Sequence, residues 1–80
     1  MEKELIIDKL TTIFRDVFSD NTIILKEEIT ANDIGSWNSL SHMLMIAEVE
    51  NNFSIKFKLK EISKLKDVGT LIDLVDSKLS

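Results

Sequence analysis

Apolar residues recur at spacings of three and four along most of the chain, which is the period of an amphipathic helix. Residues 2–19 show this first, with Glu4, Asp8, Arg15 and Asp16 left for solvent. The positions that share the apolar stripe are Ile6, Leu10, Ile13, Phe14, Val17 and Phe18. Because the chain has no proline and only two glycines to interrupt such patterns, we expect an all-α domain whose first helix buries this stripe.

A second helix is predicted from Asn38 or Ser39 to about Asn52, because Asn and Ser are preferred N-caps and the apolar period begins directly after them. This helix carries two apolar stripes on roughly opposite sides. The first consists of Met45, Ile46, Val49 and Phe53, and the second, which we call the outer stripe, consists of Leu40, Met43, Leu44 and Ala47. A small bundle fully buries only one of them, so we assign the first to the core and the outer stripe to a contact surface. The alternative is a central helix with both stripes buried.

The connection over residues 20–37 is too apolar for a free loop. We expect its large side chains to lie across the helices as pegs, namely Ile23, Ile24, Leu25, Ile29 and Ile34.

The last third of the chain predicts one short and one longer helix. Ile55, Phe57 and Leu59 alternate with basic residues, which could suggest a strand. A lone strand has no partner here, so we expect an extended stretch and then a short helix over about residues 59–65. The final helix is predicted to start at an N-cap, Asp67, and to bury Val68, Leu71, Ile72, Val75 and Leu79.

Composition and charge narrow the class of protein. The 80 residues correspond to one small domain, residues 1–80, and the absence of cysteine excludes disulfides and thiolate metal sites. The net charge of -4 argues against nucleic-acid binding, which needs clustered lysine and arginine. Residues 1–50 hold four basic and ten acidic side chains, whereas residues 51–80 hold six and four, a polarity that would orient a protein partner.

No apolar run approaches the roughly 18 residues of a membrane span, and the N-terminal "MEKELIIDKL" contains acids where a secretory signal carries bases. We therefore expect a cytoplasmic protein without a membrane span, and a monomer.

The sequence offers few residues that could act as a nucleophile, a base or a metal ligand. Ser39 is the candidate functional residue, although a serine there could also serve as a simple N-cap. The lone His42 has no orienting group and no Gly-x-Ser-x-Gly elbow beside it, so we expect a surface or partner-facing histidine and no catalytic residue. Scattered acids and one histidine give no metal-ligand spacing. Trp37 is expected to pack as a plug that fixes the loop on the bundle.

Several of these stretches resemble the acyl carrier protein family. The family's Asp-Ser-Leu motif at the start of the second helix has its match in Asn38-Ser39-Leu40, and Asp33-Ile34-Gly35 resembles Asp-Leu-Gly. Further on, "ENNFSIKF" stands where the family has an acidic helix end followed by Phe-Gly-Ile-x-Ile, and "KDVGTLIDLV" resembles Thr-Val-x-Asp-Ala-Ile-x-x-Ile. The pattern runs from Ser39 to Val75 without a gap, and implies a small four-helix bundle with three main helices, one short helix and a long first loop.

The resemblance also implies a function and partners. It makes Ser39 the acceptor of 4'-phosphopantetheine, transferred from coenzyme A by a phosphopantetheinyl transferase that uses magnesium. A phosphodiester there would be favoured by the free amides and positive dipole of a helix N-terminus. The arm would supply the thiol that this cysteine-free chain lacks. It would receive acyl groups as thioesters from an activating ligase and carry them to acyl-processing enzymes. Asn38 and the outer stripe would contact these partners.

Some residues depart from the family pattern. Asn38 replaces the usual aspartate, Trp37 directly precedes the motif, and Leu44 lies where the family often has glutamate. Lysines occupy the third-helix region where acids predominate, at Lys56, Lys58, Lys60, Lys64 and Lys66. We therefore expect dedicated partner enzymes of a fatty-acid, polyketide or specialised pathway and a more hydrophobic contact.

Two other functions remain open from the sequence. One is an aminoacyl carrier, for example a D-alanyl carrier, which would share the fold and the serine and differ in its activating ligase. The other is an unmodified helical adaptor that binds partner helices through the face of Leu40 and Met43.

Overall fold

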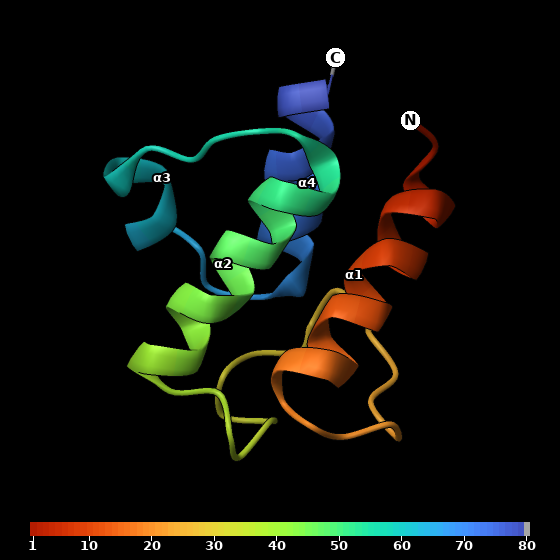
Figure 1. Cartoon of the computed structure of the whole chain (residues 1–80), viewed down its shortest axis with the longest axis vertical. Coiled ribbons are helices and arrows are strands. Elements are labelled where there is room, and N and C mark those ends of the chain that lie inside the picture. The colour runs from red at the N-terminus through yellow and green to blue at the C-terminus, as the bar shows by residue number, and fades with distance from the viewer. Residues whose placement is uncertain (80) are drawn as a thin grey trace.

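The computed structural model describes residues 1–79, so Ser80, the last residue of the expected single domain, lies outside the described residues. The described chain is all-helical, as predicted, with no strand (Figure 1). Its helices are α1 (Lys3–Val17), α2 (Ser39–Phe53), α3 (Leu59–Ser63) and α4 (Val68–Leu79). Each starts within one residue of its predicted start, whereas α1 and α3 each end two residues early.

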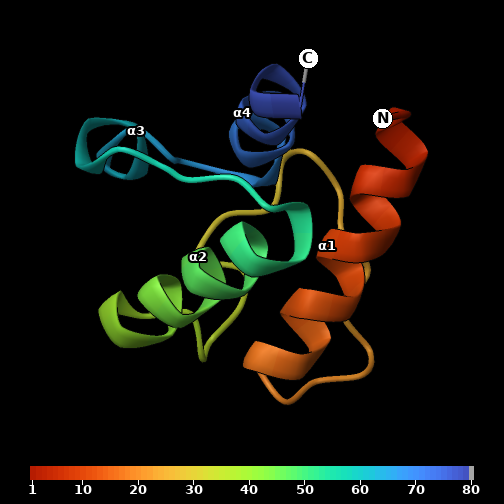
Figure 2. The ribbon, with the colours of Figure 1, turned by 45° about the horizontal axis from the view of Figure 1, so that its top comes forward.

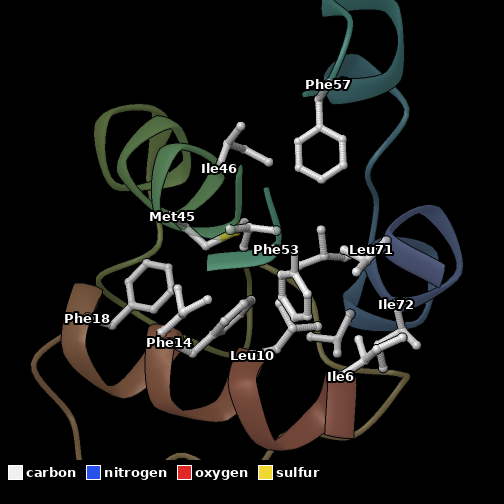
Figure 3. Packing of buried hydrophobic residues seen from close by; sticks show 14 of the residues in the cluster. Ile6, Leu10, Phe14, Phe18, Met45, Ile46, Phe53, Phe57, Leu71 and Ile72 are labelled. Carbon is white, nitrogen blue, oxygen red and sulfur yellow. The ribbon is translucent and has the colours of Figure 1, made fainter. Parts of the chain in front are cut away.

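The core lies between α1, α2 and α4, while α3 is on the opposite side of the molecule from α1 (Figure 2). Aromatic and branched side chains from these helices meet in the centre (Figure 3). The stripe predicted for α1 is buried except for Val17, which is half-buried. The first apolar stripe of α2, which we call the inner stripe (Met45, Ile46, Val49 and Phe53), is buried throughout. In α4 the expected residues are also buried except for Leu79, which packs against the core from a half-buried position.

The long connection between α1 and α2 packs on the bundle. Ile23 and Ile34 are buried, and Leu25 and Ile29 are half-buried, as expected of pegs. The prediction for Ile24 is wrong, because its side chain is 68% exposed. Burial alternates along this part of the connection: Ile23 is buried, Ile24 is exposed, Leu25 is half-buried and Lys26 is exposed. Burying Ile23 thus leaves its neighbour outside.

Arg15 also departs from the prediction that it faces solvent. It is half-buried, and its Nε donates to the carbonyl oxygen of Ile23 at 2.9 Å. The guanidinium therefore ties the end of α1 to the first part of the connection.

The middle of the connection is joined to the start of α4 by two backbone hydrogen bonds. Val68 N donates to Ile29 O and Gly69 N donates to Glu27 O, each at 2.9 Å. A Cβ on Gly69 would lie 3.2 Å from both Cβ and O of Glu27, so glycine permits this close approach. The predicted N-cap is also present, since Asp67 Oδ1 accepts from Thr70 N at 2.8 Å.

The stretch between α2 and α3 is extended, as predicted. Ile55 and Phe57 are buried, whereas Leu59 is 81% exposed at the start of α3. The amide of Phe57, which a neighbouring strand would otherwise bind, donates to Glu50 Oε2 at 2.8 Å. Because α2 itself supplies this acceptor, the alternating pattern needs no sheet.

Two leucines on α1 allow a matched test of this packing. Leu10 is 0% exposed and Leu5 is 51% exposed. We expect Leu10→Ala to lower the free energy of unfolding by about 2–5 kcal/mol, because it leaves a cavity in the core, and Leu5→Ala to lower it by less than about 1 kcal/mol. Urea denaturation followed by circular dichroism measures both, and equal losses would contradict the core described above.

Candidate functional site

Helix α2 begins with a reciprocal set of hydrogen bonds around Asn38. Its Oδ1 accepts from the amides of Leu40 and Ser41, both at 3.0 Å. In return the Asn38 amide donates to Ser41 Oγ at 2.8 Å, and the Ser41 hydroxyl donates to the carbonyl oxygen of Ser36 at 2.7 Å. Sequence reasoning placed the cap correctly but missed Ser41, although a polar residue three positions after an N-cap is the spacing of a capping box.

Ser39 is the first helical residue, and its side chain is exposed. Because Asn38 is the N-cap, the interpretation of Ser39 as a simple N-cap is wrong. Among residues 1–79 the Ser39 hydroxyl has no hydrogen-bond partner, so it is accessible from solvent and not held by the cap. The free amides expected at this helix start are fewer than predicted, because those of Leu40 and Ser41 are bonded to the Asn38 side chain.

Trp37 is the plug that the sequence predicted. Its indole packs edge-on against Phe14, with ring centroids 5.3 Å apart, and lies 5.7 Å from Phe18 in a tilted arrangement. These contacts fix the segment before Ser39 on the C-terminal half of α1.

His42 does not lie freely on the surface as expected. It is half-buried, and its Nδ1 accepts a hydrogen bond from Trp37 Nε1 at 3.0 Å. The two rings also stack, 6.0 Å apart and 16° from parallel. Burial lowers the pKa of the imidazole from its usual value, so the neutral ring that can accept from Trp37 is favoured.

A depression of about 460 Å³ opens beside Ser39. It is lined by Ala31, Trp37, Asn38, Ser39, His42 and Met43. The structure therefore brings Asn38, Ser39 and Met43 together with two residues, Trp37 and His42, that were not expected to join the site.

The outer stripe of α2 is exposed along its whole length, including Leu40 at 73%. The alternative of a central helix with both stripes buried is therefore wrong. A second depression, about 300 Å³, lies between Leu44 and Ala47 of this stripe and Val17 at the end of α1. An apolar surface thus extends from the depression beside Ser39 along the solvent side of α2.

The region around α3 carries most of the exposed positive charge of the second half of the chain. The five lysines of residues 56–66 are all exposed, and the single acid among them, Glu61, is paired with Lys78 at 2.8 Å. The Lys58 amide, which donates to Glu61, and then the Lys78 ammonium hold the pKa of this carboxyl below its usual value. The acid is thus already neutralised, and the α3 region presents positive charge.

Two negative findings apply to residues 1–79. No group of three or more His, Cys, Asp or Glu side chains is arranged to hold a metal ion. None of the described helices combines the length and the apolar character required to cross a bilayer.

Solved structures share this fold of four helices with a long first connection. The solution structure of the holo acyl carrier protein of Geobacter metallireducens is 56% identical, with a TM-score of 0.87, over 91% of this chain and 84% of that one. The crystal structure of the acyl carrier protein of Thermotoga maritima is 29% identical, with a TM-score of 0.85, over 99% of this chain and 92% of that one.

The fold is therefore that of acyl carrier proteins. From the identity and coverage of the Geobacter protein, the chain belongs to the acyl carrier protein family, which confirms the resemblance seen in its motifs. No family model and no curated protein sequence matches this chain.

The cap of α2 can be tested by substitution. Asn38→Ala removes the acceptor for two amides and should lower the free energy of unfolding by about 0.5–2 kcal/mol. Asn38→Asp keeps an acceptor and adds negative charge at the positive end of the helix, so it should retain or slightly raise stability. Denaturant unfolding of both variants measures this, and an Asn38→Ala protein as stable as the parent would contradict the described role of the cap.

His42 should make stability depend on pH. Its pKa in the folded protein is below the ordinary value of 6.5, so the unfolded chain binds the proton more readily. The free energy of unfolding should therefore fall as pH drops through about 6.5 and stop falling, for this group, below the folded pKa. Urea titrations between about pH 7.5 and pH 5 should show a shallower fall for His42→Gln. Equal slopes would mean that the imidazole titrates alike in both states.

Proposed function

We propose that this protein carries acyl groups as thioesters on a 4'-phosphopantetheine arm attached to Ser39 Oγ. The observation that carries the proposal is the exposed hydroxyl of Ser39, free of hydrogen bonds within residues 1–79, at the first position of α2 in a chain of the acyl carrier family. The Geobacter structure is of a holo carrier, which supports a prosthetic group on this protein.

The residues around Ser39 fit such a group. Asn38 fixes the start of α2, so that the serine hydroxyl is held at the positive end of the helix dipole, where a phosphodiester is favoured. The depression beside it has apolar walls from Ala31, Trp37 and Met43, against which the pantetheine chain can lie. When bound, the arm supplies a thiol that holds the acyl group, a nucleophile that this chain lacks.

The outer stripe is the surface we assign to partner enzymes. Leu40, Met43, Leu44 and Ala47 are exposed on the helix that bears Ser39, so an enzyme that receives the arm would cover them. The four residues of the stripe are uncharged, two acidic residues, Asp16 and Glu48, line the depression beside Leu44 and Ala47, and the α3 region is basic. A phosphopantetheinyl transferase, an activating ligase and acyl-processing enzymes would therefore dock mainly by apolar contact, as dedicated partners of a fatty-acid, polyketide or specialised pathway. An aminoacyl group activated by a different ligase would use the same serine and surface.

The test is the intact mass of the purified protein before and after incubation with coenzyme A, magnesium and a broad-specificity phosphopantetheinyl transferase. We expect the mass of one phosphopantetheine to be added to the parent and none to Ser39→Ala.

Ser41→Ala is the matched control. It removes a hydroxyl two residues away that is engaged in the cap, so it should cost some stability yet still accept the arm. Addition to Ser39→Ala would contradict Ser39 as the attachment site. No addition to any variant, although a known carrier is modified in the same tube and protein from native cells carries no arm, would favour an unmodified adaptor instead.

A further inference from the structure

The start of α2 offers few hydrogen-bond donors to an anion on Ser39. Asn38 Oδ1 already occupies the amides of Leu40 and Ser41, and the Ser41 hydroxyl donates to Ser36 O. No lysine or arginine lines the depression beside the serine. Among the first-turn amides of α2, the Ser39 amide alone has no partner within residues 1–79. A phosphodiester there would therefore have the helix dipole but few backbone donors, and a side-chain donor beside Ser39 would add to them.

The His42 imidazole is oriented to be that donor. Trp37 Nε1 donates to Nδ1 at 3.0 Å, so Nδ1 carries no proton and the neutral ring carries it on Nε2. Stacking against the indole, itself packed between Phe14 and Phe18, holds the plane of the ring. Within residues 1–79 the Nε2 atom has no hydrogen-bond partner, so its N–H is available to a ligand.

His42 also lies on the correct side of α2. It follows Ser39 by three residues, a spacing that brings side chains within about 5–6 Å of each other at Cβ on a helix surface. Both residues line the same depression. An atom attached to Ser39 Oγ is thus within reach of the imidazole.

We propose that His42 is a positioning residue for the prosthetic group: with Nδ1 held by Trp37, its Nε2–H donates a hydrogen bond to the phosphodiester on Ser39. The inference rests on the proposed function and adds to it a second residue that orients the arm over the depression. Trp37 takes part indirectly, by fixing which nitrogen of the imidazole is the donor.

The contact has an electrostatic consequence. A phosphodiester is an anion, so it favours the protonated imidazole and should raise the pKa of His42. No other titratable side chain lines the depression. The two rings that pack against Trp37, Phe14 and Phe18, are uncharged. Attachment of the arm is thus the one charge change at this position.

The experiment compares unmodified and phosphopantetheine-bearing protein by NMR titration between about pH 5 and pH 8. The chain has one histidine, so its Hε1 resonance reports His42 without ambiguity. The 31P resonance of the arm reports the other side of the contact, because a phosphodiester does not itself titrate in this range. We expect the pKa of His42 to rise on modification, and the 31P resonance to shift with that same pKa.

Two variants separate this contact from a merely structural role. His42→Gln should accept the arm, confirmed by mass, but its 31P resonance should no longer move with pH. Trp37→Phe keeps an aromatic ring and removes the N–H donor, so the 31P titration should become smaller as the imidazole loses its fixed orientation. An unchanged or lowered pKa of His42 in protein whose modification is confirmed by mass would overturn the inference and leave the carrier function standing. Failure of Ser39 to accept the arm would overturn both.

Discussion

Helix α2 carries two apolar stripes, and only one of them can pack against α1 and α4. The inner stripe of Met45, Ile46, Val49 and Phe53 is buried, which fixes the rotation of the helix about its axis. Ser39 and the outer stripe must then face away from the core. The burial of large side chains, at roughly 1.5–3 kcal/mol each, is therefore also what keeps the candidate site at the surface.

At the start of α2 the capping hydrogen bonds are made by Asn38 and Ser41, the neighbours of Ser39. Asn38 accepts from the amides of Leu40 and Ser41, and the Ser41 hydroxyl accepts from the amide of Asn38. The Ser39 side chain therefore takes no part in the cap. An uncharged cap also leaves no carboxylate beside the serine, where the family pattern has aspartate. The helix dipole and, when it is protonated, the His42 imidazole are thus the positive groups beside Ser39 in the depression.

Much of this architecture was predictable, because helix periodicity and N-cap preference are local properties. The helices and the outer stripe followed from spacing alone, and Asn38 from residue preference at a cap. The predictions were wrong where burial or bonding of a side chain depends on the path of the folded chain. Ile24 is as apolar as Ile23, and only the path of the folded backbone shows which of them points inward. The bond between Trp37 and His42 joins a loop to a helix across five positions, a relation that no period describes.

The two backbone bonds between the first connection and the start of α4 join residues about forty positions apart. Contacts this distant in sequence form late, because closing so long a loop costs entropy before any contact stabilises it. The part of the connection that meets α4, residues 27–29, thus reaches its final path only after α4 has been made and has docked. During synthesis on a ribosome this part must wait for the last helix of the chain, whereas the Trp37 segment just before the serine packs on a helix that was made first.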